Sequence, residues 1–204
     1  LVDSEILLGK FKNRGLLPTL VQDDADVWVL NTCGFIDAAR KDSYDAIADL
    51  CNRKDGRTLI VIGCLSQEHS QEISDRFPEV DHIAGVGNFD QVIETVFAGK
   101  KLVEISDPDL IEYSGFNSRE ILTPPHIAFV KISEGCNYSC SFCRIPRIRG
   151  KQQSRLIVDI VSEVRNLAAN GVVEIMVVSQ NTSDFGRDTG ENLLQLVTEL
   201  SKVD

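Results

Sequence analysis

Hydrophobic and polar positions in the first hundred residues alternate between two patterns. Three short apolar runs predict strands that are buried on both faces, and they lie at residues 26–31, 58–63 and 82–86. Apolar residues at helical spacing predict four helices, at residues 3–15, 36–51, 66–77 and 88–98. Regular alternation of buried strands with helices favours an α/β fold, with an open, Rossmann-like parallel sheet.

Capping residues are expected at two of these helices. Asp3 or Ser4 is predicted to cap the first helix, and Asn88 to cap the fourth. Both assignments follow from the preference of short polar side chains for the free N–H groups of a first helical turn.

The pattern fades between residues 101 and 125, where Pro, Gly, Asp and Ser cluster. Beyond it come a strand at 127–132, a helix at 154–170, a strand at 172–178 and a helix at 191–200. This order is typical of the first units of a (β/α) barrel. We therefore expect a domain at 1–104, a linker at 105–125 and the start of a barrel at 126–204, with the chain as a piece of a longer protein.

Composition narrows the function classes. The formal net charge is −10, which disfavours non-specific binding to nucleic acids or anionic membranes and is compatible with a basic protein partner. No apolar run is long enough to span a bilayer and no secretory leader is visible. Six cysteines in such a chain suggest metal ligation in a reducing, cytoplasmic environment.

Three cysteines, Cys136, Cys140 and Cys143, follow the strand at 127–132 with C-x₃-C-x₂-C spacing. Three thiolates leave one iron of a [4Fe–4S] cluster open, and this spacing resembles that of the radical S-adenosylmethionine (SAM) superfamily. The alternative, a closed zinc site, needs a fourth ligand that the neighbouring sequence does not supply.

Cys33 and Cys64 each follow a predicted parallel strand. Parallel strands end at one edge of the sheet about 4.8 Å apart, so these thiols are expected within reach of one cluster. The alternative is two structural cysteines in the core. Cys51 shares a helix face with apolar residues and is expected in the core.

The whole chain resembles the radical SAM methylthiotransferases. The resemblance rests on LVDSE at 1–5, NTCGFI at 31–36, GCLSQ at 63–67, EGC at 134–136 and EIMVVSQ at 174–180. The NTCGFI segment is similar to the RimO type, which methylthiolates an aspartate β-carbon of small-subunit ribosomal protein number twelve. The alternatives are a tRNA adenosine methylthiotransferase of the MiaB type and a non-catalytic, cluster-binding piece.

The resemblance implies two [4Fe–4S] clusters, SAM and a reducing partner such as flavodoxin or ferredoxin. Cys136, Cys140 and Cys143 would hold the SAM-cleaving cluster, and Cys33 and Cys64 two positions of the other. The third ligand of that cluster normally precedes LVDSE and is not in this sequence, so the isolated chain is expected to hold it incompletely and to be inactive.

Five residues are predicted to bind the cofactor. Phe142 lies where the resemblance implies an aromatic beside the adenine, and the alternative is a core-facing aromatic. Arg149 and Arg155 belong to a basic run without an acid, and are predicted to neutralise the cluster and the SAM carboxylate rather than form a solvated surface. Ser179 and Gln180 end a barrel strand at its catalytic edge, where SAM contact competes with ordinary strand capping.

Overall fold

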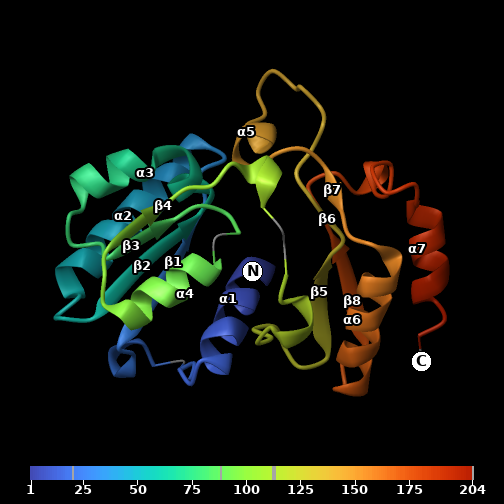
Figure 1. Ribbon diagram of the computed structural model, residues 1–204, viewed down its shortest axis with the longest axis horizontal. Coiled ribbons are helices and arrows are strands. Elements are labelled where there is room, and N and C mark those ends of the chain that lie inside the picture. The colour runs from blue at the N-terminus through green and yellow to red at the C-terminus, as the bar shows by residue number, and fades with distance from the viewer. Residues whose placement is uncertain (20, 88, 112–113, 204) are drawn as a thin grey trace.

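A computed structural model of the chain describes residues 1–19, 21–87, 89–111 and 114–203. Figure 1 shows two sheets side by side, each with its own helices, and helix α1 (Val2–Asn13) between them. The loop that carries α5 (Ile145–Arg149) arches over the gap from the second unit. Within these described residues, no helix is both long and apolar enough to cross a bilayer.

The first sheet is parallel throughout, with the order β1-β2-β3-β4. Its strands are β1 (Val27–Thr32), β2 (Thr58–Gly63), β3 (His82–Ala84) and β4 (Leu102–Glu104). The last pair in the β1–β2 register joins Thr32 to Gly63, so both strands end at the same level. The α/β class with an open parallel sheet is confirmed.

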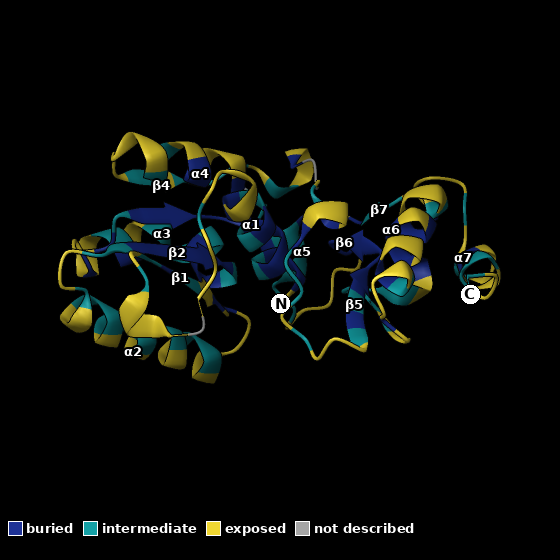
Figure 2. Ribbon diagram, turned by 90° about the horizontal axis from the view of Figure 1, so that it is seen from below, coloured by how far each residue is buried: buried dark blue, intermediate teal, exposed yellow. Residues whose placement is uncertain are grey.

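Helices cover both faces of this sheet. Helices α1 and α4 (Phe89–Ala98) bury one apolar cluster against it, which includes Ile6, Ile60 and Val92. Helices α2 (Asp37–Arg53) and α3 (Cys64–Arg76) bury the other, around Ile47 and Val61. Figure 2 shows the buried strands at the centre and exposed residues on the outer sides of the helices. The continuous apolar strands are explained by this double cover.

The second unit pairs β5 (Ile127–Lys131) with β8 (Glu174–Val178) in parallel. One face packs on α6 (Ile157–Ala169) and α7 (Leu193–Leu200) through a separate apolar cluster. Two short antiparallel strands, β6 (Ser133–Glu134) and β7 (Gln153–Ser154), flank the cysteine loop. Single 3₁₀ turns lie at Gln22–Asp24, Pro108–Leu110, Phe116–Ser118 and Thr182–Asp184.

Several local predictions were wrong. Leu1 precedes α1, so Asp3 and Ser4 lie inside the first turn and cap nothing. Helix α6 begins at Ile157, because residue Ser154 belongs to β7. Strand β4 was missed, since three residues with little burial leave no periodic signal. The predicted cap Asn88 lies outside the described residues.

The segment predicted as a linker is packed between the two units. Ile111, Phe116 and Arg119 are buried, and Phe116 joins the apolar cluster of α1. The backbone N–H of Glu120 donates to the carbonyl of Glu5 at 2.9 Å. This segment therefore connects the units through side-chain and backbone contacts as well as through the chain.

Candidate functional site

Cys33 and Cys64 directly follow the paired ends of β1 and β2. Ser43 of α2 holds the backbone of Cys33: its hydroxyl accepts from the N–H at 3.2 Å and donates to the carbonyl at 3.0 Å. Cys64 is the first residue of α3 and is half-buried, whereas Cys33 is exposed. Both cysteines thus lie at the carboxyl edge of the sheet, where parallel α/β folds place ligands.

A glycine precedes a cysteine at two points where a side chain would not fit. Gly63, before Cys64, has φ +104°, and a Cβ there would lie 2.4 Å from Asn31 Oδ1. Gly135, before Cys136, has φ +76°, and a Cβ would lie 2.1 Å from the carbonyl oxygen of Lys151. Close backbone approach and positive φ both require glycine at these positions.

The loop with Cys136, Cys140 and Cys143 leaves the second unit after β6. Its base is fixed, because the N–H of Cys136 donates to the carbonyl of Gly150 at 3.1 Å. Its tip is a turn in which the N–H of Cys143 donates to the backbone carbonyl of Cys140 at 3.0 Å. Residues 137–142 are exposed. All three cysteines are free thiols.

The donor set fits an iron–sulfur cluster by its chemistry: three free thiols within eight residues, and two more across the sheet edge. As the side chains stand, no three His, Cys, Asp or Glu residues in the described part of the chain are gathered closely enough to hold a metal ion. The structure therefore places Cys33 and Cys64 at one sheet edge and the other three cysteines on one loop, but does not bring the five into a common coordination sphere.

Arg149 connects the two cysteine groups. Its Nη2 lies 3.2 Å from Cys64 Sγ, and its Nη1 lies 2.8 Å from Asp3 Oδ2 and 3.4 Å from Glu134 Oε1. Lys131, at the end of β5, pairs with Asp3 and reaches Glu134 Oε2 at 2.5 Å. Arg149 thus links Cys64 to the charged residues at the base of the cysteine loop.

These charges stabilise one another in a buried setting. Burial raises the pKa of Asp3, but Lys131 and Arg149 outweigh it and hold that pKa well below its usual range. Burial lowers the pKa of Arg149, but Asp3, Glu134 and Cys64 together raise it well above its ordinary value. The pKa of Lys131 is raised in the same way by Asp3 and Glu134 against the effect of burial. Asp3, Lys131 and Arg149 are therefore all charged at neutral pH.

Arg155 belongs to a second buried network. It donates to Glu163 Oε2 at 2.6 Å, and its guanidinium lies 3.7 Å above the ring of Phe116. Arg119 contacts the other oxygen of Glu163 at 3.0 Å and also pairs with Glu5 of α1 at 2.6 Å. Burial dominates here, raising the pKa of Glu163 and lowering the pKa of Arg155 despite their attraction.

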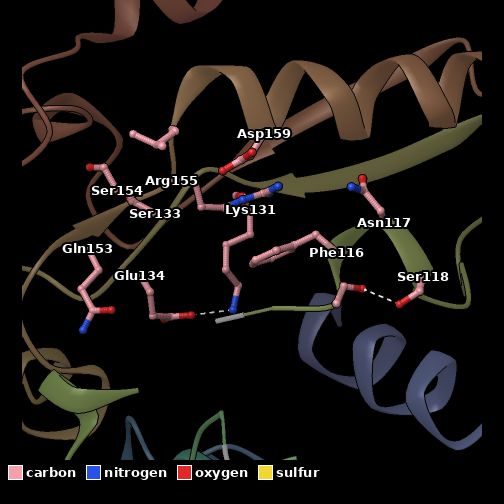
Figure 3. Close-up of a pocket in the computed structure, with 12 residues that line it drawn as sticks. Phe116, Asn117, Ser118, Lys131, Ser133, Glu134, Gln153, Ser154, Arg155 and Asp159 are labelled. Atoms are coloured by element: carbon pink, nitrogen blue, oxygen red, sulfur yellow. Dashed lines mark hydrogen bonds and ion pairs between the residues drawn. The ribbon is translucent and has the colours of Figure 1, made fainter. Parts of the chain in front are cut away.

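A cavity of about 820 Å³ lies between the linker, the β6–β7 pair and the start of α6. Figure 3 shows Lys131 and Glu134 joined across it, with Phe116 and Arg155 nearby. Of the five predicted cofactor residues, Arg155 is among the residues that line this cavity. Its described lining does not include Phe142, Arg149, Ser179 or Gln180. Asp159, from the first turn of α6, and Gln153 of β7 add polar groups to the lining.

Of the remaining predicted cofactor residues, Phe142 is exposed, whereas Ser179 and Gln180 are half-buried. Phe142 is 82% exposed, so the alternative of a core aromatic is wrong. Ser179 exchanges a hydrogen bond with Thr182 at 3.0 Å. Gln180 donates to Glu134, while its Oε1 is buried with no hydrogen-bond partner among the described residues. A buried acceptor without a partner at this strand end leaves one hydrogen-bonding position open to a bound ligand.

Sequence reasoning missed Asp3, Lys131 and Glu134, and misjudged the basic run. Arg144 forms a two-pronged pair with Glu68 of α3, at 2.8–3.1 Å, so the run does have acidic partners. Glu68 lies 76 positions from Arg144, and Asp3 lies 146 positions from Arg149. Two acidic partners were nearer in the sequence: Glu134 lies 15 positions from Arg149, and Glu163 lies 8 from Arg155. Cys51 is half-buried against the α2–α3 cluster, as expected, and burial raises the pKa of its thiol.

Comparison with known proteins gives matches to both parts of the chain. Residues 1–85 match the uncharacterized protein family UPF0004, and residues 130–203 match the radical SAM superfamily. The chain is 42% identical over 212 residues to the ribosomal protein uS12 methylthiotransferase RimO of Symbiobacterium thermophilum. It is 43% identical over 209 residues to that of Anaeromyxobacter sp. and 39% over 215 residues to that of Clostridioides difficile.

The chain belongs to the radical SAM methylthiotransferase family. Each of these alignments covers all of this chain, but the chain spans 44% to 48% of the relatives' own length. The radical SAM superfamily uses SAM and a [4Fe–4S] cluster, and the cysteine loop at 136–143 lies within the matched region.

Proposed function

We propose that this protein is a RimO-type methylthiotransferase, which adds a methylthio group to the β-carbon of an aspartate in ribosomal protein uS12. The observation that carries the proposal is the contact of Arg149 with Cys64 at 3.2 Å, which brings the segment that follows the cysteine loop against the first cysteine group. One set of three cysteines would suffice for radical chemistry alone. A second group at the same junction supports sulfur insertion, as do the names of the relatives.

Cys136, Cys140 and Cys143 would hold one [4Fe–4S] cluster, and Cys33 and Cys64 would supply two ligands of another. When bound, SAM and the first cluster supply the radical that removes hydrogen from a carbon too weakly acidic for any side chain. Phe142 would bind the adenine, while Gln180 Oε1 and Ser179 would orient the methionine part. Arg149 would keep its contact with Cys64, and Arg155 would stay paired with Glu163 beside the cavity.

The proposal extends to organisation and partners. Residues 1–104 would be the domain that holds the second cluster, 105–125 the packed connection and 126–204 the start of the radical SAM barrel. A flavodoxin or ferredoxin would supply the electron, in the cytoplasm. The net charge of −10 favours a basic protein such as uS12 as the substrate over a tRNA.

The deciding experiment uses the full-length protein, reconstituted anaerobically with iron and sulfide and incubated with SAM, a reductant and uS12. Mass spectrometry of uS12 is expected to show a methylthio group on one aspartate. Methylthioadenosine in digests of tRNA, with unmodified uS12, would instead support the MiaB-type alternative.

Iron content tests the ligands separately from activity. Cys140→Ala and Cys64→Ala are each expected to lower bound iron, because each removes a thiolate ligand. Cys51→Ala is the matched control, since its thiol packs in the helical core and should leave iron unchanged. Zinc in place of iron in the wild-type protein would contradict the proposal.

A further inference from the structure

The first turn of α1 contacts segments that flank the candidate cluster ligands in both units. Asp3 pairs with Lys131 and Arg149 of the second unit. The Ser4 hydroxyl accepts from Asn31 Nδ2 at 2.9 Å, two residues before Cys33. Glu5, the next residue, forms an ion pair with Arg119 in the segment that connects the two units.

Helix α3 approaches the second unit with one face. Cys64 and Glu68 are four residues apart and therefore neighbours on that face. Arg149 meets the first at 3.2 Å, and Arg144 meets the second with both prongs of its guanidinium. The two arginines bracket the short helix α5, which directly follows the loop that ends at Cys143. The cysteine loop is thus attached at its far end to the first unit.

The near end of the same loop is attached as well. Glu134 precedes Cys136 by two residues and contacts both Lys131 and Arg149. Because Asp3 contacts the same two cations, it closes a ring of four buried charges across the boundary between the units. Arg149 is the member that also reaches a cysteine, Cys64.

We propose that Asp3 and Arg149 are positioning residues, which hold the ends of the two units at the fixed separation that lets both cysteine-bound groups reach the same substrate carbon. The inference rests on the proposed function for its chemical meaning, but its geometry stands on these contacts. A planar guanidinium can contact a carboxylate and a sulfur on different sides at once, which a lysine ammonium on a flexible stem cannot reproduce.

The test uses the full-length protein with both clusters reconstituted, and compares Asp3→Asn and Arg149→Lys with two control variants. Arg147→Lys changes an exposed arginine on the same short helix, and Asp90→Asn neutralises an exposed partner of α1. Two quantities are measured: methylthiolated uS12 formed per 5′-deoxyadenosine released, and hydrogen exchange of residues 132–136 and 150–155.

Asp3→Asn and Arg149→Lys are expected to lower that product ratio by about tenfold or more, because misplacement by an ångström is enough for such a loss. They should also speed exchange in the two segments while bound iron stays at the wild-type level. The controls should match the wild type in both quantities. If Asp3→Asn fails to fold, Arg149→Lys decides, since it retains the buried positive charge.

Unchanged product ratio and unchanged exchange in Arg149→Lys would overturn the inference. Faster exchange with no methylthiolated uS12 from any variant, the wild type included, would support the positioning role and overturn the proposed function. The two ideas therefore fail in distinguishable ways.

Discussion

Arg119 offers a direct measure of how strongly the two units are joined. It lies between Glu5 of α1 and Glu163 of α6, at 2.6 and 3.0 Å, and all three side chains are 1% exposed. In Arg119→Ala, Glu5 loses its ion pair with Arg119. Glu163 also loses Arg119 and keeps only its ion pair with Arg155. Removal of one partner from a buried ion pair costs about 3–5 kcal/mol, because the remaining charge stays desolvated.

The expected result is a fall in melting temperature of roughly 6–20 °C at this size of domain. Thermal unfolding of the full-length protein at pH 7, followed by circular dichroism, measures it. Lys12→Ala is the matched control: Lys12 joins the same helix to Glu120 of the same segment at 2.6 Å, but the two side chains are 50% and 36% exposed. An exposed pair contributes about 1 kcal/mol or less, so this variant should melt close to the wild type.

Adding Glu5→Gln to Arg119→Ala should restore part of the lost stability. The amide removes the unpaired charge, and its oxygen can still accept from the N–H of Leu122, as Glu5 does at 3.0 Å. The reasoning is refuted if Arg119→Ala melts no lower than Lys12→Ala, or if the double variant is no more stable than Arg119→Ala.

Three further predictions concern other sites. Gly63→Ala should destabilise by about 1–3 kcal/mol in denaturant unfolding, through positive φ and a close contact, whereas Gly56→Ala, with φ +79° in open space, should cost less. Asp81 is partly desolvated, but its ion pair with Lys54 and its hydrogen bond from the N–H of Leu59 hold its pKa below the usual value. Its contribution to the free energy of unfolding is therefore present above about pH 4 and is lost as the pH falls. In Asp81→Asn, stability should depend less on pH in this acidic range. Arg144→Lys should speed hydrogen exchange in residues 137–144, since a lysine cannot form the two-pronged pair; unchanged exchange would count against that anchor.

Local patterns in the sequence predicted the elements whose burial leaves a clear run or period of apolar residues. The strands at Val27–Thr32 and Thr58–Gly63 were found because both faces are covered, which leaves a continuous apolar run. Leu102–Glu104 was not found, since a three-residue strand at the sheet edge exposes Val103. Placement of Cys33 and Cys64 at one edge followed from parallel topology alone.

Long-range charge pairing could not be predicted in this way. Asp3 and Arg149 are 146 positions apart, and Glu5 and Arg119 are 114 apart. No periodicity links such residues, and a polar residue near a helix start is ordinarily a cap. Asp3 departs from that rule because its carboxylate faces a second unit, whose position the local sequence does not encode.

Strand β1 has a consequence for the behaviour of this polypeptide in solution. It lies at the margin of its sheet, and no other strand among the described residues pairs with its outer side. A groove of about 900 Å³ runs beside it, lined by apolar residues that include Phe11, Leu17, Trp28 and Leu50. Backbone groups at such a margin are a template for pairing with another extended chain. A preparation of residues 1–204 alone should therefore self-associate as its concentration rises, and sedimentation velocity would reveal it.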